Sequence, residues 1–264
     1  MFIDWRIFYD AGAAVLAGLS PYSVAGYYNP MVVALLLAPT TLIPFDVWVW
    51  VMIGLSAVGI ITVCRKRSHW VLLSFPFIYG MSWGSLDVFL FAPSVFFGGT
   101  GLALITLKPQ LAIFIVPLKL AQWYRAGDWR NIRRFVLAAG YLWTLPVLLF
   151  PKWPQEWLQS MPKLSERSLG AASLAGLDFG AWWAVLLLAC MLGVVVWLIA
   201  KRRAEFHLPM IFAPSLWASD YLTTMQSASW LTWLAGWVFA LTGFSWMFAL
   251  MPLVIETERK SRDR

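Results

Sequence analysis

Charged residues are scarce in this sequence. Asp, Glu, Lys and Arg make up 12% of its 264 residues, whereas soluble domains carry about 25%. Uncharged stretches occur at 88–107 and 181–200, and each is long enough to cross a bilayer core of ~30 Å as a helix. The composition excludes a soluble globular domain and predicts an integral membrane protein that crosses the bilayer several times.

Cysteine and histidine are also rare, with two of each. Cys64 and Cys190 lie at or within separate apolar runs, so we expect two free thiols that act as small hydrophobic side chains. His69 and His207 have no further ligands at the spacing of a metal site. The sequence therefore predicts no disulfide, no metal site and no cofactor, and it has no recognisable cleavable signal peptide.

Positive charge is concentrated next to apolar runs. The net charge is +7, and Lys and Arg cluster at 65–67, 119–134, 201–203 and 259–264. Such clusters are typical of loops that remain in the cytoplasm. Binding of nucleic acid would require basic residues on one face of a soluble domain, so that class of function is excluded.

Apolar runs interrupted by Pro and Gly predict an all-α polytopic transmembrane helical bundle of about eight spans, some of them kinked or re-entrant. Residues 1–29 are expected to form an extracytoplasmic or interfacial amphipathic segment, and 30–150 the core helices. Residues 151–180 are expected to form an extracytoplasmic loop. The remaining part, 181–264, holds the C-terminal transmembrane helices and a basic cytoplasmic tail.

The topology of the first apolar runs is left open. If both 30–43 and 45–64 cross the membrane, the basic cluster at 65–67 lies on the same side as residues 1–29. That arrangement conflicts with the preference of Lys and Arg for the cytoplasmic side. Either the first run does not fully cross, or the cluster is an exception.

The distribution of charge between the longer loops predicts their sides. Residues 1–29 and 151–180 have no positive excess, whereas 119–134 and 201–206 are strongly basic. We therefore expect the first two segments to share one side of the membrane, opposite the other two.

Tryptophan is abundant, with 18 residues. An aromatic belt at the membrane interface is the simpler explanation. The alternative is a groove that binds carbohydrate or polyprenyl chains, because indole stacks on apolar faces while its N–H group donates a hydrogen bond.

Charges inside apolar runs are candidates for function, because each costs about 2.5–3.5 kcal/mol on insertion. Asp87 is either a helix N-cap or faces a cavity. Lys108 precedes Pro109, which frees a carbonyl group nearby. Its side chain either reaches the interface or, as we predict, faces a protein-lined cavity. Asp220 is the third such residue.

The N-terminal segment carries Asp4, Arg6 and Asp10 at helical spacing beside aromatic residues. These charges are either the solvated side of an amphipathic helix or part of a site at the extracytoplasmic face.

Several short motifs follow one another along the chain, each weak alone. They are Asp4-Trp5-Arg6-x-Phe8-Tyr9, Leu16 to Tyr22, Tyr28-Asn29-Pro30, Gly84-Ser85-Leu86-Asp87, Leu107-Lys108-Pro109-Gln110, Glu166 to Leu169, and Pro214 to Asp220. In this order they resemble glycosyltransferase family eighty-seven, bacterial mannosyltransferase-like enzymes of the polytopic GT-C fold. Where the family has Gly-Gln-x-Asn, this chain has Gly84-Ser85-Leu86-Asp87. The family also has two histidines in the last motif, and this chain lacks them. Family members have a transmembrane helix before the Asp motif, so the resemblance implies either that the true start lies upstream of Met1 or that this is a reduced member without that helix.

The resemblance implies transfer of a mannose-like sugar from a polyprenyl-phosphate donor to an extracytoplasmic acceptor, in a bacterial cytoplasmic membrane. The catalytic candidates are Asp4, as general base on the acceptor hydroxyl, and Asp10. The candidates for substrate binding are Arg6, Asp87, Lys108 and Asp220. Membrane lipids and the donor lipid are the implied partners.

Two other classes of function remain as alternatives. A non-enzymatic scaffold subunit, bound to other membrane proteins, is favoured by the departures from the family motifs. A transporter would show internal repeats with midplane charges in both halves, and no such repeat is found.

Overall fold

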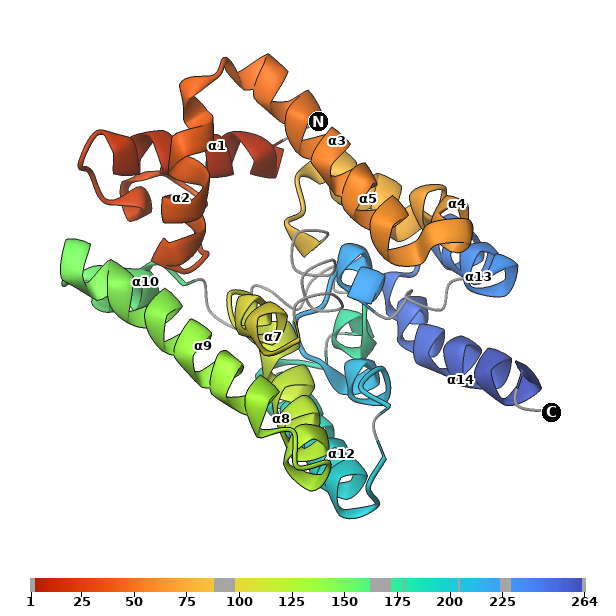
Figure 1. Cartoon of the computed structure of the whole chain (residues 1–264). Helices are drawn as coiled ribbons and strands as arrows, with labels where there is room; N and C mark the ends of the chain where they lie inside the picture. Colours follow the sequence, from red (N-terminus) through yellow and green to blue (C-terminus); the bar gives the residue numbers. More distant parts are fainter. Residues whose placement is uncertain are drawn as a thin grey trace.

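The computed structural model describes residues 3–87, 98–161, 172–177, 179–203, 205–223 and 229–262. Every regular element in these ranges is an α-helix or a 3-10 helix, which confirms the predicted all-α fold (Figure 1). The α-helices are α1 (Ile3–Leu16), α2 (Met31–Leu37), α3 (Phe45–Cys64), α4 (Ser68–Leu72), α5 (Phe75–Trp83), α7 (Gly99–Ile105), α8 (Pro109–Arg125), α9 (Trp129–Leu149), α10 (Trp153–Ser160), α12 (Ala181–Ala200), α13 (Trp230–Leu241) and α14 (Met251–Arg262). The 3-10 helices are η1 (Pro21–Ser23), η2 (Ala38–Leu42), η3 (Arg65–Arg67), η4 (Leu174–Leu177), η5 (Leu208–Phe212), η6 (Ala218–Thr223) and η8 (Ser245–Leu250).

Three stretches of the described chain are long and apolar enough to cross a membrane. They are Phe45–Leu72, Trp129–Leu149 and Trp182–Ala200. Shorter apolar helices occur at Met31–Leu42 and Trp230–Leu241. The structure thus agrees with a helical membrane protein, while the predicted number of about eight spans is not confirmed.

Proline explains why other apolar runs do not form long helices. Pro76 lies in the first turn of α5, so the run at 70–82 is divided between α4 and α5. Pro109 begins α8 and divides the run at 100–118 in the same way. Proline cannot donate a backbone hydrogen bond, and it restricts the residue before it to extended conformations. The run at 88–97 lies outside the described residues.

The first apolar run is too short to cross the membrane. Its helix, α2, has 7 residues and passes into the 3-10 turns of η2. Tyr9 of α1 donates a hydrogen bond to the carbonyl oxygens of Thr41 and Ile43, at 3.0 and 2.9 Å, which holds this run against α1. Of the two predicted alternatives, this short run favours the one in which 30–43 does not fully cross the membrane.

Helix α1 packs into the protein with its apolar side. Trp5, Phe8 and Ala11 recur at helical spacing and are buried. The indole N–H of Trp5 donates to the carbonyl oxygen of Met81 at 2.8 Å, and its ring meets Trp48 edge to face at 5.5 Å. The apolar side of the predicted amphipathic segment therefore packs against α3 and α5, and its polar side is exposed.

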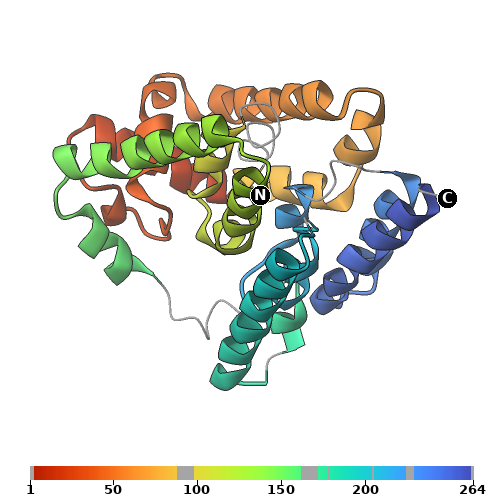
Figure 2. The same ribbon diagram turned by 60° about the horizontal axis from the view of Figure 1, so that its bottom comes forward.

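Helix α9 connects two ends of the molecule. It has 21 residues and is thus ~30 Å long, which matches the thickness of a bilayer core. At its C-terminal end, Ser20 donates to the Glu156 carboxylate at 2.5 Å, and Trp157 donates to the carbonyl oxygen of Tyr28 at 2.9 Å. Figure 2 shows α10 beside the N-terminal segment. These contacts support the predicted common side of 1–29 and the loop that follows α9, of which 162–171 and 178 lie outside the described residues.

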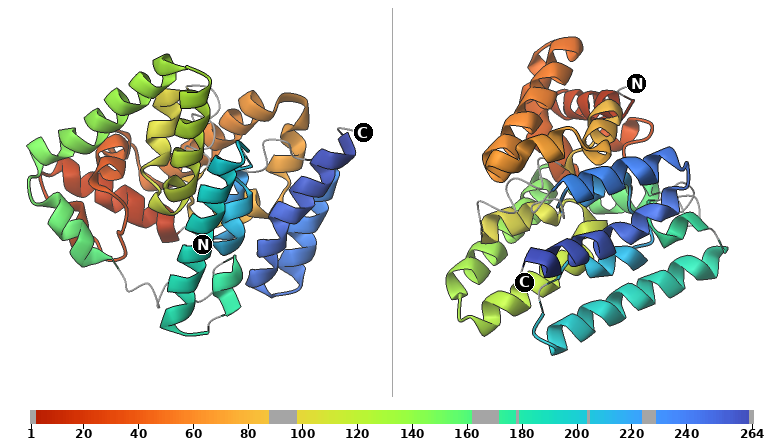
Figure 3. Two further views of the ribbon diagram at one scale, coloured as in Figure 1. Left: turned by 90° about the horizontal axis from the view of Figure 1, so that it is seen from below. Right: turned by 90° about the vertical axis from the view of Figure 1, so that its right-hand side faces the viewer.

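At the other end of α9 the ends of α8 and α12 meet. A guanidinium N–H of Arg125 donates to the carbonyl oxygen of Ile199, the last turn of α12. This contact brings the C-terminal ends of α8 and α12 together, which supports the common side predicted for 119–134 and 201–206. Figure 3 shows α13 alongside α14, and α13 also packs against α4 and α5.

Candidate functional site

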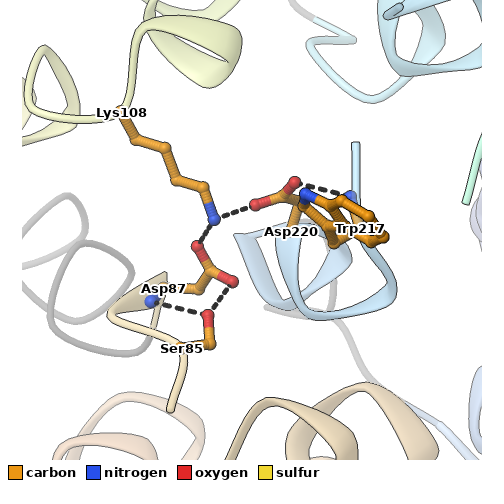
Figure 4. A network of polar contacts seen from close by, with 5 residues as sticks. All are labelled: Ser85, Asp87, Lys108, Trp217 and Asp220. Atoms are coloured by element: carbon orange, nitrogen blue, oxygen red, sulfur yellow. Dashed lines mark hydrogen bonds and ion pairs between the residues drawn. The ribbon is translucent and has the colours of Figure 1, made fainter. Parts of the chain in front are cut away.

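Three charged residues from distant parts of the chain meet in the interior. The ammonium group of Lys108 forms ion pairs with Oδ1 of Asp87 and Oδ1 of Asp220 (Figure 4). Both aspartate side chains are 0% exposed, and that of Lys108 is 16% exposed. Lys108 is thus turned into the protein rather than toward lipid. We call these three residues the buried network.

The turn between α7 and α8 presents Lys108 to the network. Pro109 is the first residue of α8, and the carbonyl oxygen of Lys108 accepts from the N–H groups of Leu111 and Ala112 at 2.9 and 3.0 Å. Proline is favoured at this position because its missing N–H would have no partner in the helix. The Lys-Pro pair in the sequence therefore ends one helix, starts the next and leaves the lysine side chain at the junction.

Asp87 is held by its neighbour Ser85. The Ser85 hydroxyl accepts from the backbone N–H of Asp87 at 3.2 Å and donates to the Asp87 carboxylate. The Asp87 carboxylate is bound to Lys108 and Ser85, and the residues whose N–H groups an N-cap at Asp87 would bind lie outside the described residues. Ser85 was not predicted as a site residue. A serine hydroxyl that accepts from the backbone N–H two residues later forms a common local turn. The spacing of Ser85 and Asp87 was therefore the feature of the sequence that could have indicated this contact.

Asp220 is placed by the 3-10 helix η6. Its Oδ2 atom accepts from the backbone N–H of Trp217 at 2.7 Å, which leaves Oδ1 directed at Lys108 (Figure 4). The network contains two carboxylates and one ammonium. A buried charge that loses its partner costs several kcal/mol, so the network holds the segments before α8, after α5 and in η6 together.

Asp4 lies beside the segment that carries Asp87. Gly84 ends α5 with a left-handed φ of 108°. A Cβ atom at Gly84 would lie 2.3 Å from the Trp5 nitrogen and 2.9 Å from the Asp4 carbonyl carbon. The first turn of α1 therefore touches the backbone of Gly84 directly, three residues before Asp87. Glycine alone meets both the conformation and this close approach.

The carboxyl of Asp4 is exposed, unlike those of the network. The protein packed around it raises the pKa of Asp4 above its usual value, and the positive charge of Lys108 partly opposes that rise. A carboxylate with a raised pKa is a better proton acceptor at neutral pH than an ordinary one.

Arg6 and Asp10 form a separate pair. Nε of Arg6 lies 3.0 Å from Oδ2 of Asp10, and the side chains are 59% and 39% exposed. The Arg6 guanidinium also lies 5.0 Å from the ring centre of Phe45. Four of the six predicted site residues are therefore brought to one region, and these two are paired with each other on α1.

Three tryptophans near α10 pack against one another with tilted rings. The ring centres of Trp143, Trp153 and Trp157 are 5.7 to 5.8 Å apart. The N–H groups of Trp143 and Trp157 donate to Thr106 and Tyr28. Other tryptophans are exposed on the long helices, as an interfacial belt requires: Trp50, Trp182, Trp197 and Trp230.

Metal-binding groups do not converge in the part of the chain that the structure describes. No group of three His, Cys, Asp or Glu side chains there could hold a metal ion. Cys64 and Cys190 are free thiols. The two carboxylates that do meet are separated by the ammonium group of Lys108.

No protein-family model matches the chain, and comparisons with curated proteins and with solved structures find no significant match.

Proposed function

We propose that this chain is a GT-C-type glycosyltransferase of a bacterial cytoplasmic membrane, which transfers a mannose-like sugar from polyprenyl phosphate to an extracytoplasmic acceptor. One observation carries the proposal. Asp4, the candidate base, lies against Gly84, close to the buried network of Asp87, Lys108 and Asp220. Motifs far apart in the sequence, which the resemblance placed in order, thus contribute to a single region.

In the proposed reaction, Asp4 accepts the proton of the acceptor hydroxyl while the hydroxyl oxygen attacks the anomeric carbon. The bond between that carbon and the phosphate oxygen breaks, and the phosphate leaves with the polyprenyl chain. The raised pKa of Asp4 suits this role, because a general base works best with a pKa near the working pH.

The contacts of Lys108 favour a positioning role over direct contact with the phosphate. Its ammonium is already engaged by two buried carboxylates, and the loop of Asp87 continues from the glycine that supports Asp4. Arg6 is the more accessible cation. Its exposed pair with Asp10 contributes only about 0–1 kcal/mol, so a phosphate can replace Asp10 at little cost.

The test is transfer of radiolabelled sugar from polyprenyl-phosphate donors in membranes that contain wild type, Asp4→Asn or Asp10→Asn. Asp4→Asn keeps the shape of the side chain and removes its basicity, so we expect transfer to fall by about 10²–10⁴-fold. Asp10→Asn changes the second catalytic candidate on the same helix, away from Gly84, and we expect it to lower transfer less than Asp4→Asn does. Equal transfer by wild type and Asp4→Asn would end the proposed mechanism.

A scaffold subunit is the second candidate, and the buried network favours it. The two carboxylates that bind the lysine come from different segments of the chain. Such a cluster is expected where buried charges hold the segments of a fold together. No transfer by wild type with any polyprenyl donor, together with stable purification of the chain with a second membrane protein, would support this alternative.

A further inference from the structure

Helix α9 lies at the edge of the molecule with little protein around it. Pro146 is its one buried residue, and all residues of this helix are described. Its contact side lies on α7, where a Cβ at Gly99 would be 2.1 Å from the carbonyl oxygen of Asn131 and 2.7 Å from the nitrogen of Phe135. Helix α9 also contacts α2, α8 and α10, and one of its sides is exposed.

One outward side of α9 changes from basic to apolar along the helix. Its residues follow the spacing i, i+3, i+4, i+7, i+11 and i+18, which keeps them on one face. The face begins with three exposed arginines and continues with Leu137 and Tyr141, which are 62% and 64% exposed, and Leu148 beyond them. We call it the α9 stripe: Arg130, Arg133, Arg134, Leu137, Tyr141 and Leu148.

The arginines of the stripe have no carboxylate partner among the described residues. The nearest acidic residue in the sequence, Asp128, accepts from the backbone N–H and side-chain amide of Asn131 at 3.2 and 2.7 Å. Tyr124 and Trp129 pack edge to face at 5.5 Å beside the arginines, and both are exposed. Tyrosine and tryptophan are enriched at the level of lipid headgroups.

We propose that the α9 stripe binds an anionic phospholipid. The three guanidinium groups hold its phosphate and negative headgroup, and an acyl chain lies along Leu137, Tyr141 and Leu148. Guanidinium groups bind phosphate through two parallel hydrogen bonds and are strongly preferred for this contact. From Arg134 to Leu148 the helix rises ~20 Å, enough to cover the hydrocarbon of one leaflet, about half of the ~30 Å core.

Charge favours a lipid over a second protein helix at this surface. An apolar partner helix would cover three arginines without supplying any negative charge, and an unpaired buried charge costs several kcal/mol. An anionic lipid supplies the negative charge at the arginines and an apolar chain along the rest of the face. This site is independent of the proposed sugar transfer.

The experiment is native mass spectrometry of the full chain in detergent with equal amounts of phosphatidylglycerol and phosphatidylcholine. We expect wild type to retain phosphatidylglycerol preferentially. Each arginine near an anionic lipid contributes a factor of about five in binding, so R130Q/R133Q/R134Q should remove the preference, and R133Q alone should lower it about five-fold. Leu137→Ser should weaken retention of both lipids.

The matched control is R65Q/K66Q/R67Q, which removes the same number of charges from η3. This variant should keep the preference of wild type. The proposal is overturned if wild type shows no preference, if the control variant loses it equally, or if a second copy of the chain replaces the lipid. The proposal is also overturned if inorganic phosphate displaces the lipid at the same concentration at which phosphatidylglycerol binds. The acyl chain would then contribute nothing to binding. Circular dichroism of each variant verifies the helical fold.

Discussion

The buried network and the pair of Arg6 with Asp10 contain the same kinds of groups in two different environments. In the network, both aspartates are 0% exposed and one lysine joins three segments. In the pair, both side chains are exposed and only four residues separate them on one helix. Water solvates the charges of the pair when they separate, whereas both carboxylates of the network are enclosed by protein. Burial, rather than the number of ion pairs, decides how much each cluster contributes to stability.

Loss of the lysine should have the largest effect. Lys108→Met leaves two buried carboxylates without their counterion, which we expect to lower the free energy of unfolding by about 3–5 kcal/mol. Thermal unfolding of the purified protein in detergent measures this. Lys119→Met is the matched control on the same helix, since Lys119 forms no ion pair among the described residues. Equal melting temperatures for the two variants would show that the network contributes little.

Gly84→Ala should be the next most damaging change. A Cβ there would lie 2.3 Å from the Trp5 nitrogen, in addition to the left-handed φ of 108°. Gly18 also has a left-handed φ, of 73°, but nothing lies within 4 Å of a Cβ at that position. We expect Gly18→Ala to cost about 1–2 kcal/mol from the backbone conformation alone and Gly84→Ala to cost more. Equal losses in chemical denaturation would mean that the contact between α1 and Gly84 is not tight.

Asp220→Asn should destabilise less than Lys108→Met, although it changes the same network. The neutral side chain keeps an oxygen that can accept from Trp217, and Asp87 and Lys108 remain as a matched pair. We expect a loss of about 1–3 kcal/mol, measured in the same unfolding experiment. A loss larger than that of Lys108→Met would mean that Asp220 supports η6 through contacts other than the lysine.

Asp10→Asn should have the smallest effect on stability. It breaks an exposed pair at helical spacing, and such pairs contribute about 0.3–0.5 kcal/mol. We expect its melting temperature to be nearly that of wild type. A loss comparable to that of Asp220→Asn would show that α1 depends on this pair and would remove the contrast between the two clusters.

The candidate site shows what local patterns predict well. Asp87, Lys108 and Asp220 were recognised because a charge in an apolar run is costly wherever the run packs. The Lys-Pro pair lies at the junction of α7 and α8, a break between helices that was not predicted from the sequence. Spacing along the chain contains no information about which of these charges meet, because the contacts join residues in different segments.

Composition alone predicted a helical membrane protein, because scarce charge and long apolar runs restrict a chain to helices that satisfy their own backbone hydrogen bonds. Clusters of Lys and Arg also predicted which loops lie together, because charge resists transfer across the bilayer. The tertiary structure decided that the run at 30–43 is divided between α2 and η2, which pack against α1. It also decided that Lys108 faces two carboxylates and that Asp4 rests on Gly84. These contacts depend on how distant segments pack, because a buried charge can pair with an oppositely charged residue from any part of the chain that packs beside it.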